Sequence, residues 1–505
     1  MKSEIEFILK KAQRLIQQKK IAPAETLLLN EYNVWANHPL INLALGEIFF
    51  LKGDATACLQ YLEIAYKHGK NIPSVVVSFA EKLRLNNETT QAREVLKIAL
   101  LNSPCDRVLL ESYANFCLTD QNRLESLKLN SRLLLLFPED STIHANIAEA
   151  YAALDNYEKS LEHQNIAIKY DTGSQVRLNR AITLLTLKKY EEGWAEYENR
   201  LGDDITSSPR RRLRVPRWNR QSLQNKTILV CSEQGVGDEL YFSSYLPRLI
   251  EISGRVILET DPRLKQLFRD SLEEITVFPY SRRLAYEQPV FNYGWLPKSI
   301  YPDFYIDLAS LPHFLFEGWM KPLNKFGYLK ISKDAHDYWS KYLFKISSGR
   351  PVVGLCWRSG LNTIDRQQWY PPLHLWEQVL TVPNICFLSL HYDDDIEDIR
   401  FFKEQFDVSL IKLSDIDLKN DFEKLGAICT ALTGVIAPST AVAHLAAAVG
   451  KRTIIIEKTR TWCPIVNGLD AFLPCIRRIF PPNAGDWEWV FNGVRKELSS
   501  WLSTE

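Results

Sequence analysis

Two short polar stretches carry the residues whose types and spacing suit chemistry. The first is the glycine turn Gly235-Val236-Gly237-Asp238, which follows the apolar run 228–231 and precedes an amphipathic segment. Strand, glycine turn and helix in this order open a parallel α/β domain, and ligands bind where such strands end. The two glycines let the backbone turn sharply and let a ligand come close. Asp238 falls where the helix starts, so it either caps the helix or takes a catalytic role.

The second stretch is the polar turn Ser439-Thr440, between an apolar run at 435–437 and an alanine-rich segment at 441–448. The unpaired N–H groups in the first turn of the expected helix form a ready site for an anion such as phosphate. The alternative is that Ser439 or Thr440 only caps the helix. His444 lies about one turn into this helix, where it either faces a cleft or sits in the core.

The elements that must position these turns form two successive α/β halves. Further apolar runs predict strands at 255–259 and 275–278 in the first half, and at 351–356, 385–390 and 453–456 in the second. Gly450 ends the alanine-rich helix as a C-cap. An amphipathic segment after 487 predicts a closing helix at the C-terminus. The sequence therefore predicts two Rossmann-like domains, 227–348 and 349–505.

Small residues recur every 34 positions over the first two hundred residues. The register runs through Ala12, Gly46, Ala80, Ala114 and Ala148, with Ala181 following after 33, and a second small residue lies twelve positions after each. This period resembles that of the tetratricopeptide repeat, or TPR, in which paired helices cross at small residues. Residues 1–201 are therefore expected to form an α-solenoid whose concave surface holds an extended partner segment. A spacer or a dimerisation arm is the alternative.

The segment 202–226 breaks the helical pattern and is expected to be a linker. It holds six arginines, at 210, 211, 212, 214, 217 and 220. Such a basic cluster could hold phosphate. The alternative is a solvated connector that packs through Val215 and Trp218.

Composition excludes several function classes. Lysine plus arginine equals aspartate plus glutamate, 61 each in 505 residues, so no net field attracts nucleic acid or an acidic membrane. No apolar run reaches the roughly 18–20 residues of a membrane span, and charges interrupt the N-terminal apolar run, so no signal peptide is expected. Nine scattered cysteines without a C-x-x-C pair indicate reduced thiols in a cytoplasmic protein and no metal site among them.

Taken together, the motifs resemble the tetratricopeptide-repeat glycosyltransferases of GT-B fold that are related to bacterial heptosyltransferases. They are SEQGVGDELYFSSYLP and ETDPRLKQLF in the first half, and GLCWRSG, APSTAVAHLAAAVG and AGDWEWV in the second. The resemblance covers nearly the whole chain and implies an N-terminal TPR α-solenoid followed by two Rossmann-like domains of a GT-B enzyme. The class includes flagellin glycosyltransferases, which hold flagellin with the repeats and transfer a nonulosonic acid such as pseudaminic acid from its CMP form.

The resemblance also implies roles for individual residues. Asp238 matches the general base. On the donor side it implies Arg358, Ser359, Ser439, Thr440, Ala441 and His444, and on the acceptor side Glu233, Gln234, Gly235 and Gly237. Ser439 stands where the heptosyltransferase pattern has aspartate. Serine removes a negative charge beside the phosphate, which favours a CMP-linked sugar over a heptosyl nucleotide diphosphate.

These inferences predict a metal-independent protein O-glycosyltransferase that needs no cofactor beyond its nucleotide-sugar donor. No Asp-x-Asp motif falls in the expected cleft, and Asp393-Asp394-Asp395 is typical of a helix N-terminus. The expected partner is flagellin, bound by the repeats. The alternatives are a heptosyltransferase-like enzyme with a glycan acceptor and a catalytically inactive TPR adaptor. The sequence leaves the sugar, the acceptor residue and the oligomeric state open.

Overall fold

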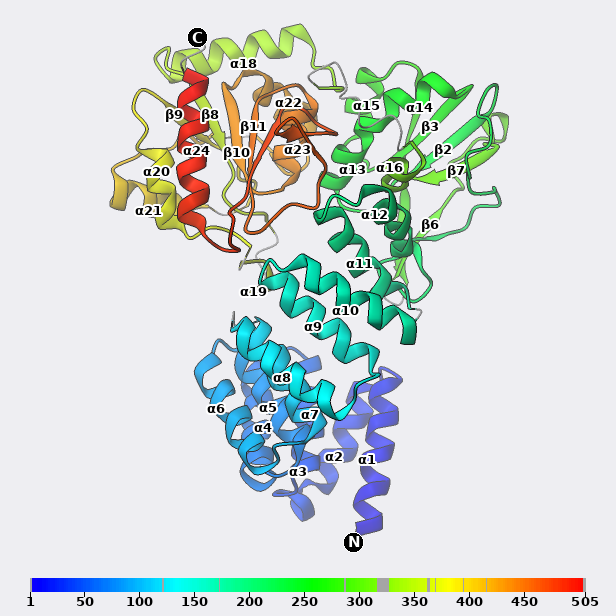
Figure 1. Cartoon of the computed structure of the whole chain (residues 1–505), viewed down its shortest axis with the longest axis vertical. Coiled ribbons are helices and arrows are strands. Elements are labelled where there is room, and N and C mark those ends of the chain that lie inside the picture. The colour runs from blue at the N-terminus through cyan, green and yellow to red at the C-terminus, as the bar shows by residue number, and fades with distance from the viewer. Residues whose placement is uncertain are drawn as a thin grey trace. The chain divides into compact units, whose positions relative to one another are not determined.

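The chain forms two compact units, Met1–Leu154 and Asp155–Glu505 (Figure 1). The computed structural model describes residues 2–119, 122–171, 173–285, 288–315, 327–360, 364–367, 369–393, 395–414 and 416–502. The first unit is helical throughout its described part, and the second combines helices with two parallel sheets. None of the described helices is both long and apolar enough to cross a membrane.

The first unit is a stack of helix hairpins. Its helices are α1 (Lys2–Gln17), α2 (Ile21–Trp35), α3 (Pro39–Leu51), α4 (Ala55–His68), α5 (Pro73–Leu85), α6 (Thr89–Asn102), α7 (Arg107–Thr119), α8 (Arg123–Leu136) and α9 (Ser141–Ala153). The small residues of the 34-residue register are buried where helices cross. At Gly46 a Cβ atom would come within 2.7 Å of Leu62 Cγ, so this crossing has no room for a side chain. The TPR α-solenoid predicted for the N-terminal part is confirmed.

The repeat pattern continues beyond the first unit. The helices α10 (Tyr157–Tyr170), α11 (Ser174–Thr186) and α12 (Tyr190–Tyr197), and the 3₁₀ helix η1 (Glu198–Leu201), belong to the second unit. Trp194 of α12 is fully buried, with its ring 6.2 Å from Phe242 and 5.8 Å from Phe472 of the α/β part. The division between the units therefore falls inside the predicted repeat domain 1–201, because its last helices bury their apolar side chains on the sheet elements.

The first sheet is parallel, with strand order β4-β3-β2-β7. Its strands are β2 (Thr227–Cys231), β3 (Arg255–Thr260), β4 (Ile275–Pro279) and β7 (Phe304–Asp307). The connecting helices include α13 (Val236–Phe242), α14 (Leu246–Ile252), α15 (Lys265–Ser271) and α16 (Leu311–Phe314). A smaller sheet joins β1 (Arg210–Arg211), β6 (Gln288–Asn292) and β5 (Ser281–Ala285). The strands predicted at 255–259 and 275–278 are confirmed.

The segment 202–226 is part of this lobe and not a free linker. Val215 and Trp218 are buried, as the connector alternative expected. The Arg211 side chain, which is 6% exposed, pairs with Glu259 (Nη1–Oε2, 3.0 Å) and Asp307 (Nη2–Oδ1, 2.8 Å). A buried guanidinium is tolerated only when carboxylates pair with it, so these ion pairs fix the segment to the ends of β3 and β7.

The second sheet is also parallel, with strand order β14-β11-β10-β8-β9. Its strands are β8 (Val352–Leu355), β9 (Cys386–Ser389), β10 (Gly434–Ala437), β11 (Thr453–Ile456) and β14 (Ile476–Ile479). The associated helices include α19 (Ile364–Gln367), α20 (Glu377–Leu380), α21 (Ile396–Phe406), α22 (Phe422–Ala431) and α23 (Ala441–Ala448). A two-stranded ribbon joins β12 (Ile465–Val466) and β13 (Leu469–Asp470).

Two further helices pack on this second sheet. The predicted closing helix is α24 (Trp487–Leu502), and at Gly434 of β10 a Cβ atom would meet the Trp501 ring at 2.2 Å. Helix α18 (Lys333–Ile346) packs against α22, and its His336 Nδ1 lies 3.1 Å from Thr430 Oγ1. This helix thus joins the second sheet although it precedes the predicted boundary at 348/349, because its buried face includes Trp339 and Leu343.

Candidate functional site

The two polar turns meet in one cavity of about 360 Å³. The turn after β2 leads into α13, and the turn after β10 leads into α23, so the first turns of both helices line the cavity. At Gly237 the backbone of α13 lies close to the first turn of α23. A Cβ atom there would lie 3.2 Å from the Ala441 nitrogen and 3.4 Å from His444 Nδ1. A side chain at 237 would therefore fit only if the first turn of α23 shifted slightly.

Asp238 both caps its helix and lines the cavity. It occupies the third position of α13, and the Gly235 N–H donates to its Oδ2 at 3.3 Å. Burial raises the pKa of Asp238, while the Gly235 N–H and the Arg366 charge oppose that shift. Asp238 is therefore not the N-cap, which is Gly235, although its carboxylate still caps the helix from the third position. The catalytic role stays a prediction.

The turn Ser439-Thr440-Ala441 forms the opposite wall. Thr440 is the N-cap of α23, and its Oγ1 accepts a hydrogen bond from the Ala443 N–H at 3.4 Å. Ser439 is exposed, and its Oγ lies 3.4 Å from His444 Nε2. The capping alternative therefore holds for Thr440, whereas Ser439 and the first turn of α23 face the cavity.

His444 lines the cavity and also belongs to the core, so both sequence alternatives apply. Its side chain is 5% exposed and stacks on Tyr241, with ring centroids 5.0 Å apart. Its Nδ1 lies 2.8 Å from the Gly237 carbonyl oxygen, which can only accept, so Nδ1 carries the proton. Burial and the nearby Arg478 lower the pKa of His444 to about 3. The neutral ring thus ties α23 to the turn before Asp238.

Arg358 does not take the place that the sequence predicted. Its guanidinium pairs with Asp393 and lies 3.2 Å from Asp398 Oδ2, and it is absent from the described cavity wall. Arg358 therefore takes part in ion pairs with Asp393 and Asp398. Ser359, the next residue, does line the cavity and accepts a hydrogen bond from the Tyr370 hydroxyl at 2.7 Å. Asp394, in the predicted acidic helix start, lies outside the described residues.

Three cationic residues that the sequence analysis did not single out line the cavity: Arg263, Arg366 and Lys419. Arg263 is held by Asp261 (Nε–Oδ1, 2.8 Å) and donates to the Lys419 carbonyl at 3.2 Å. Arg366 is exposed, and its charge acts on the Asp238 carboxyl. Only Arg263 had a signal in the sequence, since it stands in the motif ETDPRLKQLF.

Two residues predicted on the acceptor side anchor the loop instead. Glu233 is buried, pairs with Arg200 of η1 (Oε1–Nη2, 2.7 Å) and accepts the Ala309 N–H at 2.9 Å. Gln234 donates from Nε2 to the Tyr197 hydroxyl of α12 at 3.0 Å. Gly235 and Gly237 remain in the cavity wall. The last helical hairpin therefore holds the loop that carries Asp238.

The cavity combines the features of an anion site with one carboxylate. The positive ends of two helix dipoles and three cationic side chains surround it, which suits a phosphate group. Asp238 can accept a proton from a hydroxyl bound beside that phosphate. Among the described residues, no three His, Cys, Asp or Glu side chains are grouped as metal ligands.

Comparison with known proteins places the chain in a family. No family model matches it. Protein FlbA of Caulobacter vibrioides is 31% identical to it over 434 residues, which cover 84% of this chain and 72% of that protein. The chain belongs to the FlbA family. This FlbA-family chain is also similar to the TPR repeat-containing protein YpiA of Bacillus subtilis, with 26% identity over 181 residues, 35% of this chain and 41% of YpiA.

Solved structures give weaker likenesses. A tetratricopeptide repeat protein from Parabacteroides merdae has a TM-score of 0.34 and 17% identity, covering 39% of this chain and 78% of that one. The APC/C hetero-tetramer Cut9-Hcn1 gives a TM-score of 0.34 and 14% identity, covering 38% of this chain and 39% of that one.

Proposed function

We propose that this FlbA-family chain is a protein O-glycosyltransferase of GT-B fold. It transfers a nonulosonic acid of the pseudaminic acid type from a CMP-linked donor to serine or threonine of flagellin. The observation that carries the proposal is the cavity that joins the Asp238 carboxylate to two helix N-termini and three cations. Two parallel sheets whose strands end at one cavity, with a closing C-terminal helix, support the GT-B part of the proposal. The sequence motifs support the choice of donor and acceptor.

The proposed mechanism is a direct displacement. Asp238 accepts the proton of the acceptor hydroxyl, the hydroxyl oxygen bonds to the anomeric carbon, and the bond from that carbon to the phosphate oxygen breaks. CMP leaves with the electron pair. The first turns of α13 and α23, together with Arg366, stabilise the negative charge on the departing phosphate. Burial, which raises the pKa of Asp238, makes the carboxylate a better proton acceptor.

The acceptor is a protein in this proposal because the chain carries a TPR solenoid. A stack of hairpins offers an extended surface, which suits a polypeptide better than a single sugar. Flagellin is the acceptor of the glycosyltransferases that the sequence motifs resemble. Transfer to newly made flagellin would take place in the cytoplasm.

One observation favours a second candidate, a TPR adaptor without catalysis. The Asp238 carboxylate accepts a hydrogen bond from its own helix cap, which a purely structural residue would also do. The adaptor would bind the same protein through the repeats and release no nucleotide. A glycan-directed transferase has no observation of its own in this structure.

The deciding experiment offers the full chain a panel of CMP-, UDP-, GDP- and ADP-sugars with and without flagellin from the same organism. Nucleotide release and the intact mass of flagellin are measured together. We expect CMP release from a CMP-nonulosonic acid and a matching gain in flagellin mass. The Asp238→Asn variant is the control for contaminating activity. Nucleotide release from none of the donors, with flagellin still bound, would establish the adaptor instead.

A further inference from the structure

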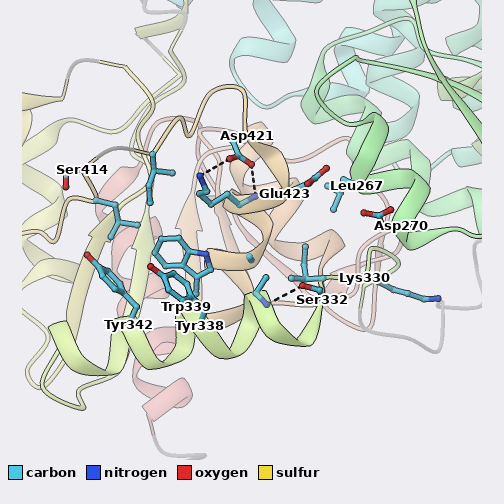
Figure 2. Close-up of a pocket in the computed structure, with 16 residues that line it drawn as sticks. Leu267, Asp270, Lys330, Ser332, Tyr338, Trp339, Tyr342, Ser414, Asp421 and Glu423 are labelled. Carbon is cyan, nitrogen blue, oxygen red and sulfur yellow. Dashed lines mark hydrogen bonds and ion pairs between the residues drawn. The ribbon is translucent and has the colours of Figure 1, made fainter.

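A second and larger cavity, of about 1030 Å³, lies in the second unit between α15, α18 and α22 (Figure 2). It shares no lining residue with the cavity around Asp238. Cavities that hold one small molecule span about 300–1000 Å³, so this one has room for several residues of a peptide. Nothing in the proposed transfer reaction uses it.

Helix α18 supplies an aromatic wall. The rings of Tyr338 and Tyr342 are stacked, with centroids 6.4 Å apart and planes at 16°, and Trp339 stands edge-on to both. Figure 2 shows these side chains on the cavity side of the helix. Tyr338 is 60% exposed, which is unusual for a large aromatic side chain on a packed helix. The wall therefore offers ring surface that the described residues leave open to solvent.

Trp339 adds an unused hydrogen-bond donor. Its side chain is only 8% exposed, but its indole N–H still reaches solvent and donates to none of the described residues. The N–H is therefore free to donate to water or to a bound ligand. A ligand in this cavity would therefore gain by presenting an oxygen, such as a peptide carbonyl, to Trp339.

The opposite side of the cavity is acidic. Glu423 of α22 has no ion-pair partner among the described residues, whereas the lysines of the wall are engaged: Lys424 pairs with Asp421 at 3.1 Å and Lys330 with Glu273 at 3.5 Å. Burial and the nearby Asp270 carboxylate raise the pKa of Glu423. Figure 2 shows that Glu423 and Asp270 come from different helices and lie on the same side of the cavity. Asp270, Asp421 and Glu423 all line this cavity, so a cation bound there would relieve the repulsion among their carboxylates.

We infer that this cavity binds a polypeptide segment that carries a lysine or arginine next to an apolar residue. The cationic group lies between Glu423 and Asp270, the apolar residue packs on Tyr338 and Tyr342, and a backbone carbonyl accepts the hydrogen bond from Trp339. The aromatic rings, the indole N–H and the carboxylates line one cavity, so one short peptide segment can contact all three. The inference concerns binding alone and does not depend on the proposed transferase activity.

The test uses the full chain and a fluorescein-labelled peptide, Gly-Ser-Leu-Lys-Leu-Ser-Gly, followed by fluorescence anisotropy. We expect saturable binding that is about tenfold weaker when glutamate replaces the lysine, and also weaker when serines replace both leucines. Unlabelled hexylamine, which has the charge and an apolar stem but no backbone, should compete only at far higher concentration. Absence of saturable binding, or equal affinity for hexylamine and the peptide, would overturn the inference.

Matched variants locate the site. Glu423→Gln should weaken binding of the lysine peptide about tenfold, since a hydrogen bond to a charged group is lost. Trp339→Phe removes the N–H together with part of the buried ring, and Tyr338→Ala changes an exposed ring. Both should bind severalfold more weakly, and thermal melts of the two variants separate a lost contact from lost stability. The controls Glu404→Gln on α21 and Trp489→Phe on α24 are exposed positions outside the cavity and should bind as the parent does. Unchanged affinity in the three cavity variants would contradict the assignment.

Discussion

Asp238 combines a structural and a proposed chemical role in one carboxyl group, and a single substitution separates them. Asparagine can accept the same hydrogen bond from Gly235, so Asp238→Asn should keep the fold and the affinity for CMP. It cannot accept the acceptor proton, so transfer should fall by at least about 10²-fold. Nucleotide release, calorimetric titration with CMP and a thermal melt measure the three properties. Transfer within about tenfold of the parent would contradict the base role.

The same carboxyl group predicts a pH dependence. The base works only when it is deprotonated, so kcat/KM should fall as pH drops through the pKa of Asp238, which burial raises. His444 should add no second limb near neutrality, because its pKa of about 3 keeps it neutral there. A pH profile of kcat/KM, with a substrate whose own ionisation is known, measures this. For Asp238→Asn, the residual kcat/KM should not show this fall at low pH.

Arg366 and Arg358 form a matched pair for testing the donor site. Arg366 lines the cavity, whereas Arg358 is held by Asp393 and Asp398. Arg366→Ala should weaken CMP binding by about tenfold or more, because charge-assisted hydrogen bonds contribute roughly 1.5–3 kcal/mol. Arg358→Ala should leave CMP affinity nearly unchanged and lower the thermal stability instead. Calorimetric titrations that give the reverse order would restore Arg358 to the site.

Among individual residues, the sequence predicted those in the turns that follow strands. It did not predict the contacts of residues whose partners lie far away in the chain. Asp238, Ser439, Thr440 and His444 follow strand ends, and parallel strands bring such turns together. The partners of Glu233 and Arg358 stand 33 and 35 positions away, so no local pattern could show their engagement.

Among the elements, η1 and α12 act as a clamp on the loop before α13. Arg200 pairs with Glu233 and Tyr197 accepts from Gln234, so the last hairpin fixes where α13 begins. The sequence predicted the hairpin from its small residues and the strands from their apolar runs. The clamp was not predictable, because a buried ion pair needs two segments whose contact only the folded chain creates.

This clamp predicts an asymmetry between a buried and an exposed ion pair. Arg200→Gln leaves the Glu233 charge buried without its cation, which should cost about 3–5 kcal/mol of unfolding free energy. It should also speed hydrogen exchange in residues 232–239. Arg210→Gln breaks the pair with the exposed Asp203 and should cost at most about 1 kcal/mol.

Denaturant unfolding and hydrogen-exchange mass spectrometry distinguish these outcomes. Adding Glu233→Gln to Arg200→Gln should recover part of the lost stability, because no unpaired buried charge then remains. Equal effects of the two arginine substitutions on exchange in 232–239 would show that the clamp does not position the loop.

For the whole molecule, the boundary between the compact units does not coincide with the end of the repeat pattern. The helices α10, α11 and α12 continue the repeat period, yet they belong to the unit that contains both sheets. Periodicity reports which helices stack on one another. It does not report where the stack also buries side chains on a different element, as Trp194 does on Phe242 and Phe472.

A truncation series tests this division. A chain of residues 155–505 should unfold cooperatively and bind CMP with the parent's affinity, because it keeps Trp194 and the Arg200–Glu233 pair. A chain of residues 205–505 loses both. It leaves Glu233 buried without a cation and exposes the apolar surface under Trp194, so it should aggregate or unfold at a much lower denaturant concentration.

Residues 1–154 should remain helical alone and, under the proposed function, bind flagellin. Residues 155–505 should modify flagellin far more slowly than the full chain. Circular dichroism, calorimetry with CMP and flagellin pull-down measure each step. If 205–505 matches 155–505 in stability and CMP affinity, the last hairpin belongs to the repeat array alone and the division at Leu154 has no functional meaning.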